Sequence, residues 1–539
     1  MMLTMPGLPM FGHGQIEGFS EKYGMEYKQA YYNETSDEHL VWRHNKELFP
    51  LMKMRHLFSQ VENFEFYDFI DKNGDLNQNV YAFSNRSGNN TALVLYNNSY
   101  YETEGSIVFS HPKMISGNGG MKRPHHITEL LSIKLFREYY YIYTDHRTQL
   151  QYLLSGKEIA EQGFRIHLFG YQYRVCLHFK EIYDAEGKFE KLYNLLNGKG
   201  VTSVDEALKE MELLPLHIKY ENFFSYDNME KVRTYLVHKP DKKKKDEVIA
   251  LPGKLDKELD LLVSEFSKYM NGKTTNEKIE KKFHSNLSDC RNFFQFWISY
   301  NNRKSITKWM KSCDEILPIN SKLETNREYI TFINLLLLKQ LFSKKSDSGK
   351  INILFDELLL SKPVTNLLQK QSNGTSIHQR IDLIKTLLNI FSLEKKKSDK
   401  TIGDKKTKMA VKSDTETNNF MPSIKVLLGE NIVHNIIRVN EFEGTTYFNK
   451  ERFEEFLRWI LLLNLTQPVE KLDKKKQSSK TEIEKEILVK SKNIYERFIE
   501  LIDKAELCGY DFVKFNKELD YIPKIIVKTK KLIKKRKKI

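Results

Sequence analysis

The sequence predicts a multi-domain α+β protein in which an antiparallel β-sandwich is followed by a large, mostly α-helical region. Two observations predict this order. Between residues 62 and 179, apolar and polar residues alternate in short runs separated by turn residues, which is typical of the strands of a sandwich. Beyond residue 184 the apolar residues recur at about every third or fourth position, which is typical of amphipathic helices. The 539 residues suffice for several domains with sizeable cores.

The β region is predicted from its turns as well as its alternation. An Asn73-Gly74 pair between two alternating runs indicates a hairpin, in which Asp68, Asp71 and Asp75 belong to a solvated turn. These acids lack the spacing of a calcium-binding loop. Further strands are expected at 91–96, 105–109, 138–144, 164–169 and 171–179.

The helical part is expected to contain two modules. Residues 186–393 form the first, 394–419 are a disordered lysine-rich linker, and 420–523 form the second. In the second module Asn449 is a candidate N-cap, and the apolar run at 459–463 is expected to be buried. Helices of the first module are expected at 188–196, 204–214, 255–270, 293–310, 328–342, 351–368 and 377–391.

The charge is unevenly distributed along the chain. The sequence contains 86 lysine and arginine residues against 71 aspartate and glutamate residues, a net charge of +15. Nine of the positive charges lie in the basic tail at residues 524–539. A solvated lysine-rich tail explains this segment, and non-specific attraction to nucleic acid or another anionic surface is the functional alternative.

The distribution of cysteines and the hydropathy of the chain indicate the cellular compartment in which the protein is expected. The longest apolar runs, at 335–338 and 459–463, are far shorter than a membrane-spanning helix. The cysteines are scattered and contain no Cys-x-x-Cys pair, which favours a reducing environment. We therefore expect a cytoplasmic protein without a membrane span. The four cysteines are Cys176, Cys290, Cys313 and Cys508.

The first eighteen residues differ in composition from the rest. They begin as an apolar segment, turn at Pro6-Gly7, and continue as a glycine-rich loop that carries His13, Gln15 and Glu17. We expect an apolar strand followed by this loop.

A helix is expected after the loop. Thr35 and Glu38 have the spacing of a capping box, which predicts that the helix begins with Thr35 as its N-cap. Pro50 predicts that this helix is interrupted or that a second helix begins there.

The opening stretch resembles the last barrel strand of the α-amylase family, glycoside hydrolase family 13. The motif is Pro-Gly-x-Pro-x-x-x-x-Gly at residues 6–14, followed by an acid and another glycine at Glu17 and Gly18. The resemblance continues to about residue 185. It implies that residues 1–60 are the last strand, loop and helix of a truncated (β/α)8 barrel, and that 61–185 are the antiparallel domain which follows the barrel in family members.

The resemblance implies an activity on α-glucans. Family members cleave or transfer α-glucosidic bonds with retention, using a carboxylate nucleophile and a carboxylic acid. Their catalytic carboxylates precede the last barrel strand, and the matching motifs do not occur in this chain, so no catalytic residue is assigned. The chain is expected to be the C-terminal part of an α-glucan-acting or maltodextrin-acting enzyme. It would be inactive without an N-terminal barrel or a complementing polypeptide, and no cofactor or metal is expected.

The opening loop is the candidate substrate site. Active sites lie at the C-terminal ends of barrel strands, so the resemblance places His13, Gln15 and Glu17 where they would hydrogen-bond sugar hydroxyls. The sequence departs from the family pattern here. Family members generally have aromatic residues where Gly12 and His13 stand, and their acid falls one place before Glu17. A purely structural loop, whose glycines permit tight backbone approach, is the alternative.

Two other ionisable clusters occur in the β region, His125-His126 and Asp145-His146-Arg147. A metal or catalytic site would need a third convergent ligand. We expect these residues to be hydrogen-bonded groups of turns and strand ends.

Two other functions remain open. One is a non-catalytic carbohydrate-binding or scaffolding module, which would bind glycans without turnover. The other is a nucleic-acid-associated helical protein, whose binding would depend strongly on salt and on residues 524–539. Motifs of other enzyme classes, such as a Walker loop or a dinucleotide fingerprint, do not occur in the sequence.

Overall fold

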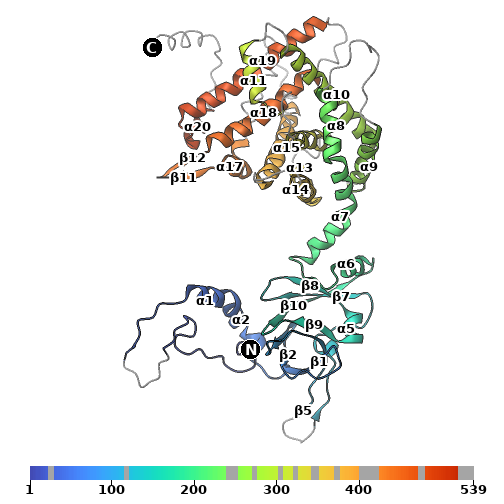
Figure 1. The fold of residues 1–539 in the computed structure, drawn as a ribbon, viewed down its shortest axis with the longest axis vertical. Coiled ribbons are helices and arrows are strands. Elements are labelled where there is room, and N and C mark those ends of the chain that lie inside the picture. The colour runs from blue at the N-terminus through green and yellow to red at the C-terminus, as the bar shows by residue number, and fades with distance from the viewer. Residues whose placement is uncertain are drawn as a thin grey trace. The chain divides into compact units, whose positions relative to one another are not determined.

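A computed structural model describes most of the chain, and these residues fall into two compact units, Met1–Glu212 and Leu213–Ile539. The first unit contains a sheet with short helices, and the second is mostly helical (Figure 1). The expectation of a mixed protein with an antiparallel β domain and many helices is confirmed. The described residues are 1–21, 29–114, 121–237, 253–269, 276–301, 307–319, 326–341, 351–369, 377–399, 424–425, 427–470 and 480–519.

The strand expected at the beginning of the chain is not formed. The N–H groups of Thr4 and Met5 both donate to the carbonyl of Met1, at 2.9 and 3.1 Å, so residues 1–5 make a turn. No strand of the described chain pairs with residues 1–18. An extended strand needs a neighbour to satisfy its backbone N–H and C=O groups, and the turn satisfies part of them locally.

The first helix begins two residues later than the capping pattern predicted. The side chain of Asp37 accepts the N–H groups of His39 and Leu40, at 3.0 and 3.1 Å, and is therefore the N-cap. Thr35 is not the cap. Aspartate and threonine are both good N-cap residues, and sequence alone does not choose between neighbouring candidates.

Four short helical segments follow Asp37. Pro50 lies in the first turn of one of them, where a proline without an N–H group is tolerated, so it begins a new helix as expected. A π-helical turn directly precedes that helix. The segments are α1 (Glu38–Arg43), η1 (His44–Leu48), α2 (Phe49–Met52) and α3 (Arg55–Phe58).

A continuous eight-stranded antiparallel sheet forms the body of the first unit, with strand order β8-β7-β10-β3-β2-β1-β4-β9. Each strand expected between residues 62 and 179 is present, with ends shifted by a few residues, and β8 is an addition. A separate two-stranded ribbon is formed by β5 (Lys113–Met114) and β6 (Met121–Lys122). The strands of the large sheet are β1 (Glu65–Asp71), β2 (Val80–Ser87), β3 (Asn90–Asn97), β4 (Thr103–Ser110), β7 (Tyr139–Asp145), β8 (Gln151–Ser155), β9 (Phe164–Leu168) and β10 (Tyr173–Tyr183).

The sheet curls until its two ends face each other. The rings of Tyr143 in β7 and Phe164 in β9 lie 5.8 Å apart, although these strands are near opposite edges of the sheet. The expected sandwich is therefore one continuous sheet folded over its own core. Short helices α4 (Ile127–Leu130) and α5 (Gly156–Gln162) contribute Ile127 and Ile159 to this core.

The other face of the sheet is covered by the short helices. Phe83 and Val94 on this face pack with Leu51 of α2 and with Leu57 and Phe58 of α3. Their neighbours Ala82, Leu93 and Leu95 point into the curled core, as the two-residue period of a strand requires.

The first unit extends beyond the boundary expected at residue 185. Leu192 of α6 (Lys188–Leu196) and Val204 of α7 (Val204–Phe223) are fully buried against Tyr140 and Leu153 of the sheet. Both helices cover an outer surface of β7 and β8, and the unit ends at Glu212.

The described residues of the second unit share one hydrophobic core, which extends from Leu213 to Leu519. The two helical modules expected at 186–393 and 420–523 therefore share one core from residue 213 onward. Its elements are α8 (Tyr226–Val237), α9 (Gly253–Tyr269), α10 (Asn276–Asn301), α11 (Lys308–Ile316), α12 (Asn326–Leu341), α13 (Ile351–Glu357), α14 (Ser361–Gln369), α15 (Ile377–Asp399), α17 (Asn431–Ile437), β11 (Asn440–Phe442), β12 (Thr445–Tyr447), α18 (Lys450–Glu470), α19 (Lys480–Leu507) and α20 (Phe512–Glu518).

Helix α18 agrees with its sequence pattern. The side chain of Asn449 accepts the N–H of Arg452 at 3.0 Å, so it caps the helix as expected. The apolar run at 459–463 is buried in the core of the second unit.

Other helix boundaries differ from the expectations. The helix expected at 293–310 is two helices, α10 and α11. The helix expected at 351–368 is broken near Leu359, whose φ of +48° lies outside the helical region. Helix α15 continues to Asp399, so residues 394–399 are helical, in keeping with the good helix propensity of lysine and glutamate. The rest of the expected linker and the tail at 524–539 lie outside the described residues.

The curled core predicts the effect of deleting a central side chain. Leu93 is fully buried in β3, so Leu93→Ala should destabilise the first unit by about 2–5 kcal/mol. The measurement is hydrogen–deuterium exchange of β2 and β10, the two strands that pair with β3. Leu76→Ala is the control, because Leu76 is 50% exposed. Equal exchange in the two variants would contradict the assignment of the core.

Candidate functional site

One end of the N-terminal segment is fastened to α3. The guanidinium group of Arg55 donates to the carbonyl oxygens of Leu3, at 2.7 Å, and of Gly7. The N–H of Gly7 also donates to the carbonyl of Ser59 at 3.4 Å. Leu3 and Thr4 are buried. Residues 1–7 are therefore held against the helices, and the glycine-rich loop begins from a fixed point.

The other end of the loop is fastened to α1 and η1. Nδ1 of His44 lies 3.1 Å from the carbonyl oxygen of Ile16. A carbonyl only accepts, so Nδ1 of His44 carries the hydrogen. The N–H of Asp37 donates to the carbonyl of Glu17 at 2.8 Å. These two bonds fix the backbone on either side of the Glu17 side chain.

The loop requires glycine at two positions. The carbonyl of Gly14 accepts the N–H groups of Gly18 and Phe19, at 2.7 and 2.9 Å, in a tight turn. Gly14 has a φ of +72°, and a Cβ there would lie 2.6 Å from Cβ of Phe19. Gly18 has a φ of +82°, and a Cβ there would lie 2.9 Å from the side chain of Leu40. Only glycine fits both conformations without strain.

The three residues predicted to bind sugar lie on this one loop but in different environments. Oε1 of Gln15 accepts the N–H of Gly12 at 2.7 Å, so this oxygen closes the turn. His13 is exposed, with its ring 5.9 Å from that of Phe19, and Glu17 is half-buried. The structure thus gives Gln15 a local structural role. Sugar binding by the three side chains remains a prediction.

Two carboxylates that the sequence analysis did not select organise the segment after the loop. Glu34 accepts the N–H groups of Glu21 and Ser20, at 3.0 and 2.8 Å, and these bonds lower the pKa of its carboxyl group. Glu21 in turn accepts the N–H groups of Tyr31 and Tyr32, each at 2.8 Å. Both acids are therefore engaged with the backbone. Their partners are about ten or more positions away, so no local motif marks them.

The short helices are joined to the sheet through Glu47 in the π-helical turn. Its carboxylate accepts the hydroxyl of Tyr173 in β10 and, at 3.2 Å, Nε–H of Arg43. Burial raises the pKa of Glu47, but these two hydrogen bonds outweigh it and the pKa is lowered. Burial, followed by the bond to Glu47, raises the pKa of Tyr173 to about 12. Nε2–H of His146 donates to the Glu47 carbonyl at 2.8 Å.

The Asp145-His146-Arg147 cluster is structural, as expected. Asp145 is completely buried at the end of β7. Its carboxylate accepts the Thr148 hydroxyl at 2.9 Å and the guanidinium of Arg174 at 3.0 Å. Arg174 also donates to the hydroxyl of Tyr152 at 2.8 Å. The buried charge is thus compensated by an opposite charge and by hydrogen bonds, as burial of a charge requires.

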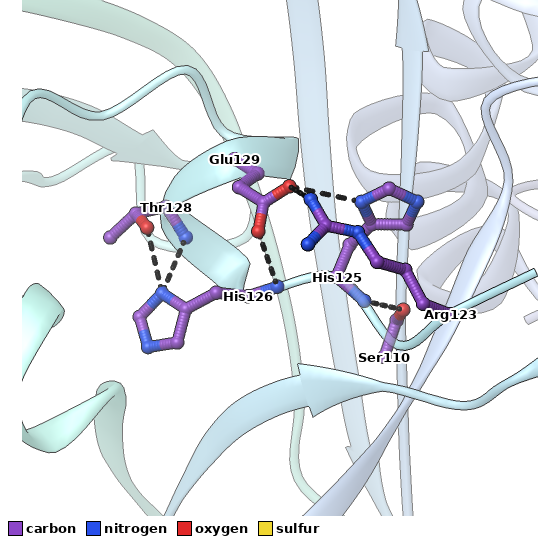
Figure 2. Close-up of polar contacts among 6 residues, drawn as sticks. All are labelled: Ser110, Arg123, His125, His126, Thr128 and Glu129. Atoms are coloured by element: carbon purple, nitrogen blue, oxygen red, sulfur yellow. Dashed lines mark hydrogen bonds and ion pairs between the residues drawn. The ribbon is translucent and has the colours of Figure 1, made fainter.

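The His125-His126 pair begins helix α4 (Figure 2). Nδ1 of His126 accepts the N–H of Thr128 at 3.3 Å, and Oε1 of Glu129 accepts the N–H of His126 at 3.4 Å, which completes a capping box. Nδ1–H of His125 donates to Oε2 of Glu129 at 3.0 Å, and Arg123 donates to the same oxygen at 3.3 Å. The two rings point away from one another, so they do not converge on a common ligand.

Within the described ranges, no group of three or more histidine, cysteine, aspartate or glutamate residues is arranged to hold a metal ion. Over the same residues, none of the helices combines the length and the apolar character needed to cross a membrane.

Comparison with known proteins identifies no relative. No family model, no curated protein and no solved structure matches this chain.

The positive φ of Gly14 predicts that a methyl group added at this position destabilises the loop. Gly14→Ala should destabilise the loop by about 1–2 kcal/mol, because an L-residue is strained at this φ and its Cβ would contact Phe19. Amide exchange of residues 8–21 should accelerate about 5-fold to 30-fold.

Gly12→Ala is the matched control. Its φ is not positive, and a Cβ there would meet only the Gln15 side chain at an ordinary distance of 3.6 Å. Similar acceleration in both variants would mean that the tight turn at Gly14 does not hold the loop.

The His126 cap predicts a pH dependence of α4. Burial lowers the pKa of His126 from its ordinary value of 6.5, and Nδ1 accepts a hydrogen bond that protonation would remove. The contribution of the His126 cap to the stability of α4 is therefore present above pH 6.5, and it is lost as the pH falls through the lower pKa that His126 has in the folded state.

Amide exchange of residues 127–135 is measured at each pH in the wild-type protein and in His126→Asn, a variant that keeps a capping side chain. As the pH falls from about 7.5 to about 5.5, the ratio of the wild-type exchange rate to the variant exchange rate should rise. A ratio that stays constant would show that His126 does not titrate in the cap.

Proposed function

We propose that this chain provides the non-catalytic C-terminal part of an α-amylase-like glycoside hydrolase that acts on α-glucans, with the catalytic carboxylates supplied by a barrel polypeptide. The observation that carries the proposal is the exposed apolar surface of the segment that has the barrel-strand motif. Leu8 and Met10 in the loop are 86% and 76% exposed, and Trp42 of α1 is 57% exposed.

Helix α1 presents further apolar side chains that are not buried. None of its residues is buried, although its sequence includes Leu40, Val41 and Trp42. A helix with apolar residues normally buries one face, and concentrated apolar exposure marks an interaction site. In a (β/α)8 barrel, neighbouring strands and helices would cover both the last strand and the helix that follows it. The proposed occupant of this surface is therefore the rest of the barrel.

The order of elements also supports the proposal. The glycine-rich loop is followed by short helices and then by an antiparallel β domain, which is the order in the α-amylase family. The hydrogen bonds to Ile16 and Glu17 hold the end of the loop from the side of α1 and η1. In the completed enzyme this anchoring would hold the loop at the barrel mouth, where His13 and Glu17 would contact sugar hydroxyls.

The proposal is tested by reconstitution. The chain, the product of the reading frame immediately upstream of its gene, and an equimolar mixture are each incubated with maltodextrin, and new reducing ends are measured. Turnover is expected only in the mixture. Turnover by the chain alone, or none in the mixture, would contradict the proposal.

A pair of surface variants tests the interface. Leu8→Asp should reduce turnover of the mixture at least about tenfold, because it places a charge in the apolar contact without altering the folded chain. Leu507→Asp is the matched control, since Leu507 is 83% exposed in the second unit. Equal activities of the two mixtures would exclude Leu8 from the interface.

A further inference from the structure

Two adjacent turns of the first unit present four exposed aromatic side chains. Tyr100 and Tyr101, between β3 and β4, are 84% and 83% exposed. Phe169 and Tyr171, between β9 and β10, are 58% and 47% exposed. We call these four residues the aromatic patch. Exposed aromatic side chains add nothing to a core, so this concentration on two turns needs an explanation of its own.

The two turns are held rigidly against each other. The side-chain amide of Asn97 donates to the carbonyls of Tyr101 and Phe169, at 2.7 and 3.0 Å. The N–H of Tyr171 donates to the carbonyl of Ser99 at 2.9 Å. The backbones approach so closely at Gly170 that a Cβ there would lie 2.3 Å from the carbonyl oxygen of Tyr100.

The rings are also oriented by their neighbours. Those of Tyr100 and Tyr171 meet edge to face, with centroids 4.8 Å apart, and Phe169 meets His167 in the same way at 4.8 Å. Three of the four rings therefore have a neighbouring ring that restricts their rotation, which reduces the entropy lost when a ligand binds.

The two turns that carry the patch are polar but nearly neutral. Glu102 is the only charged side chain among residues 98–102 and 169–172, and it lies 3.4 Å from Nε2 of His167. The other polar residues of these turns are Asn98, Ser99 and Gln172. A surface for nucleic acid needs lysine or arginine to neutralise phosphates, and these turns contain neither.

We propose that the aromatic patch binds a neutral oligosaccharide, and that this oligosaccharide is an α-glucan. A sugar ring has an apolar face of C–H groups, which packs against the negative face of an aromatic ring, and hydroxyl groups at its edge, which bond to tyrosine, asparagine and glutamine side chains. The oligosaccharide class follows from the patch itself. Its identification as an α-glucan rests on the proposed function.

Binding is measured on the intact chain, by titration calorimetry with maltoheptaose, without any barrel polypeptide. Wild type should bind, whereas Tyr100→Ala and Tyr171→Ala should each weaken binding about tenfold or more, because each removes a ring from the platform. Tyr100→Phe keeps the ring and should retain most of the affinity. Tyr226→Ala, which removes a tyrosine that is 60% exposed in the second unit, should have no effect.

Three results would overturn the inference. They are no binding of maltoheptaose by wild type, equal binding by the wild-type, Tyr100→Ala and Tyr171→Ala proteins, and a concentration-dependent dimer that the two alanine substitutions dissociate. Equal affinity for cellohexaose would overturn the α-glucan assignment. Because the experiment needs no turnover, glucan binding with an inactive mixture would refute only the reconstitution proposal. An active mixture without binding at the patch would refute only this inference.

Discussion

The hydrogen-bonded carboxylate of Glu47 is the interaction on which the arrangement of the N-terminal segment depends. It joins η1 to β10 through Tyr173, and the backbone carbonyl of the same residue receives His146 from the end of β7. Hydrogen bonds to an ionised carboxylate are about twice as strong as neutral ones, and the Glu47 side chain is only 15% exposed. The π-helical turn brings the side chain and the carbonyl of one residue to two different strands. Since η1 also holds the loop through His44, this joint sets the position of the loop relative to the sheet together with the packing of α2 and α3 on the sheet.

Much of the fold was predictable from the sequence because its signals are local. The alternation of apolar and polar residues predicted most of the strands, and Pro50 and Asn449 marked helix starts that the structure contains. The prediction failed where the outcome depends on distant partners. The opening segment forms a turn because no strand pairs with it. The first unit ends at residue 212 and not at the expected residue 185, because Leu192 and Val204 pack on the sheet.

The candidate site was predictable only in part, for the same reason. The glycines of the opening loop were visible in the sequence, and the structure shows why Gly14 and Gly18 are needed. The residues that hold the loop, Arg55 and His44, were not identified, because each bonds to a backbone carbonyl 28 or more positions away. The sequence contains no pattern that announces such a contact. Exposure of an aromatic side chain is likewise decided by tertiary packing, so the patch on the two turns was not predicted.

The position of β10 has a consequence for how the sheet is completed during synthesis. This strand is the last of the eight in the sequence, yet it lies between β7 and β3 and pairs with both. Until residues 173–183 leave the ribosome, β1–β4 with β9 and β7 with β8 are two separate pieces, and the edges of β3 and β7 that later pair with β10 are unpaired. Non-local pairing of this kind is slow and leaves strand edges open to other chains. The nascent first unit therefore exposes the inner edges of β3 and β7 to intermolecular pairing until β10 covers both of them at once.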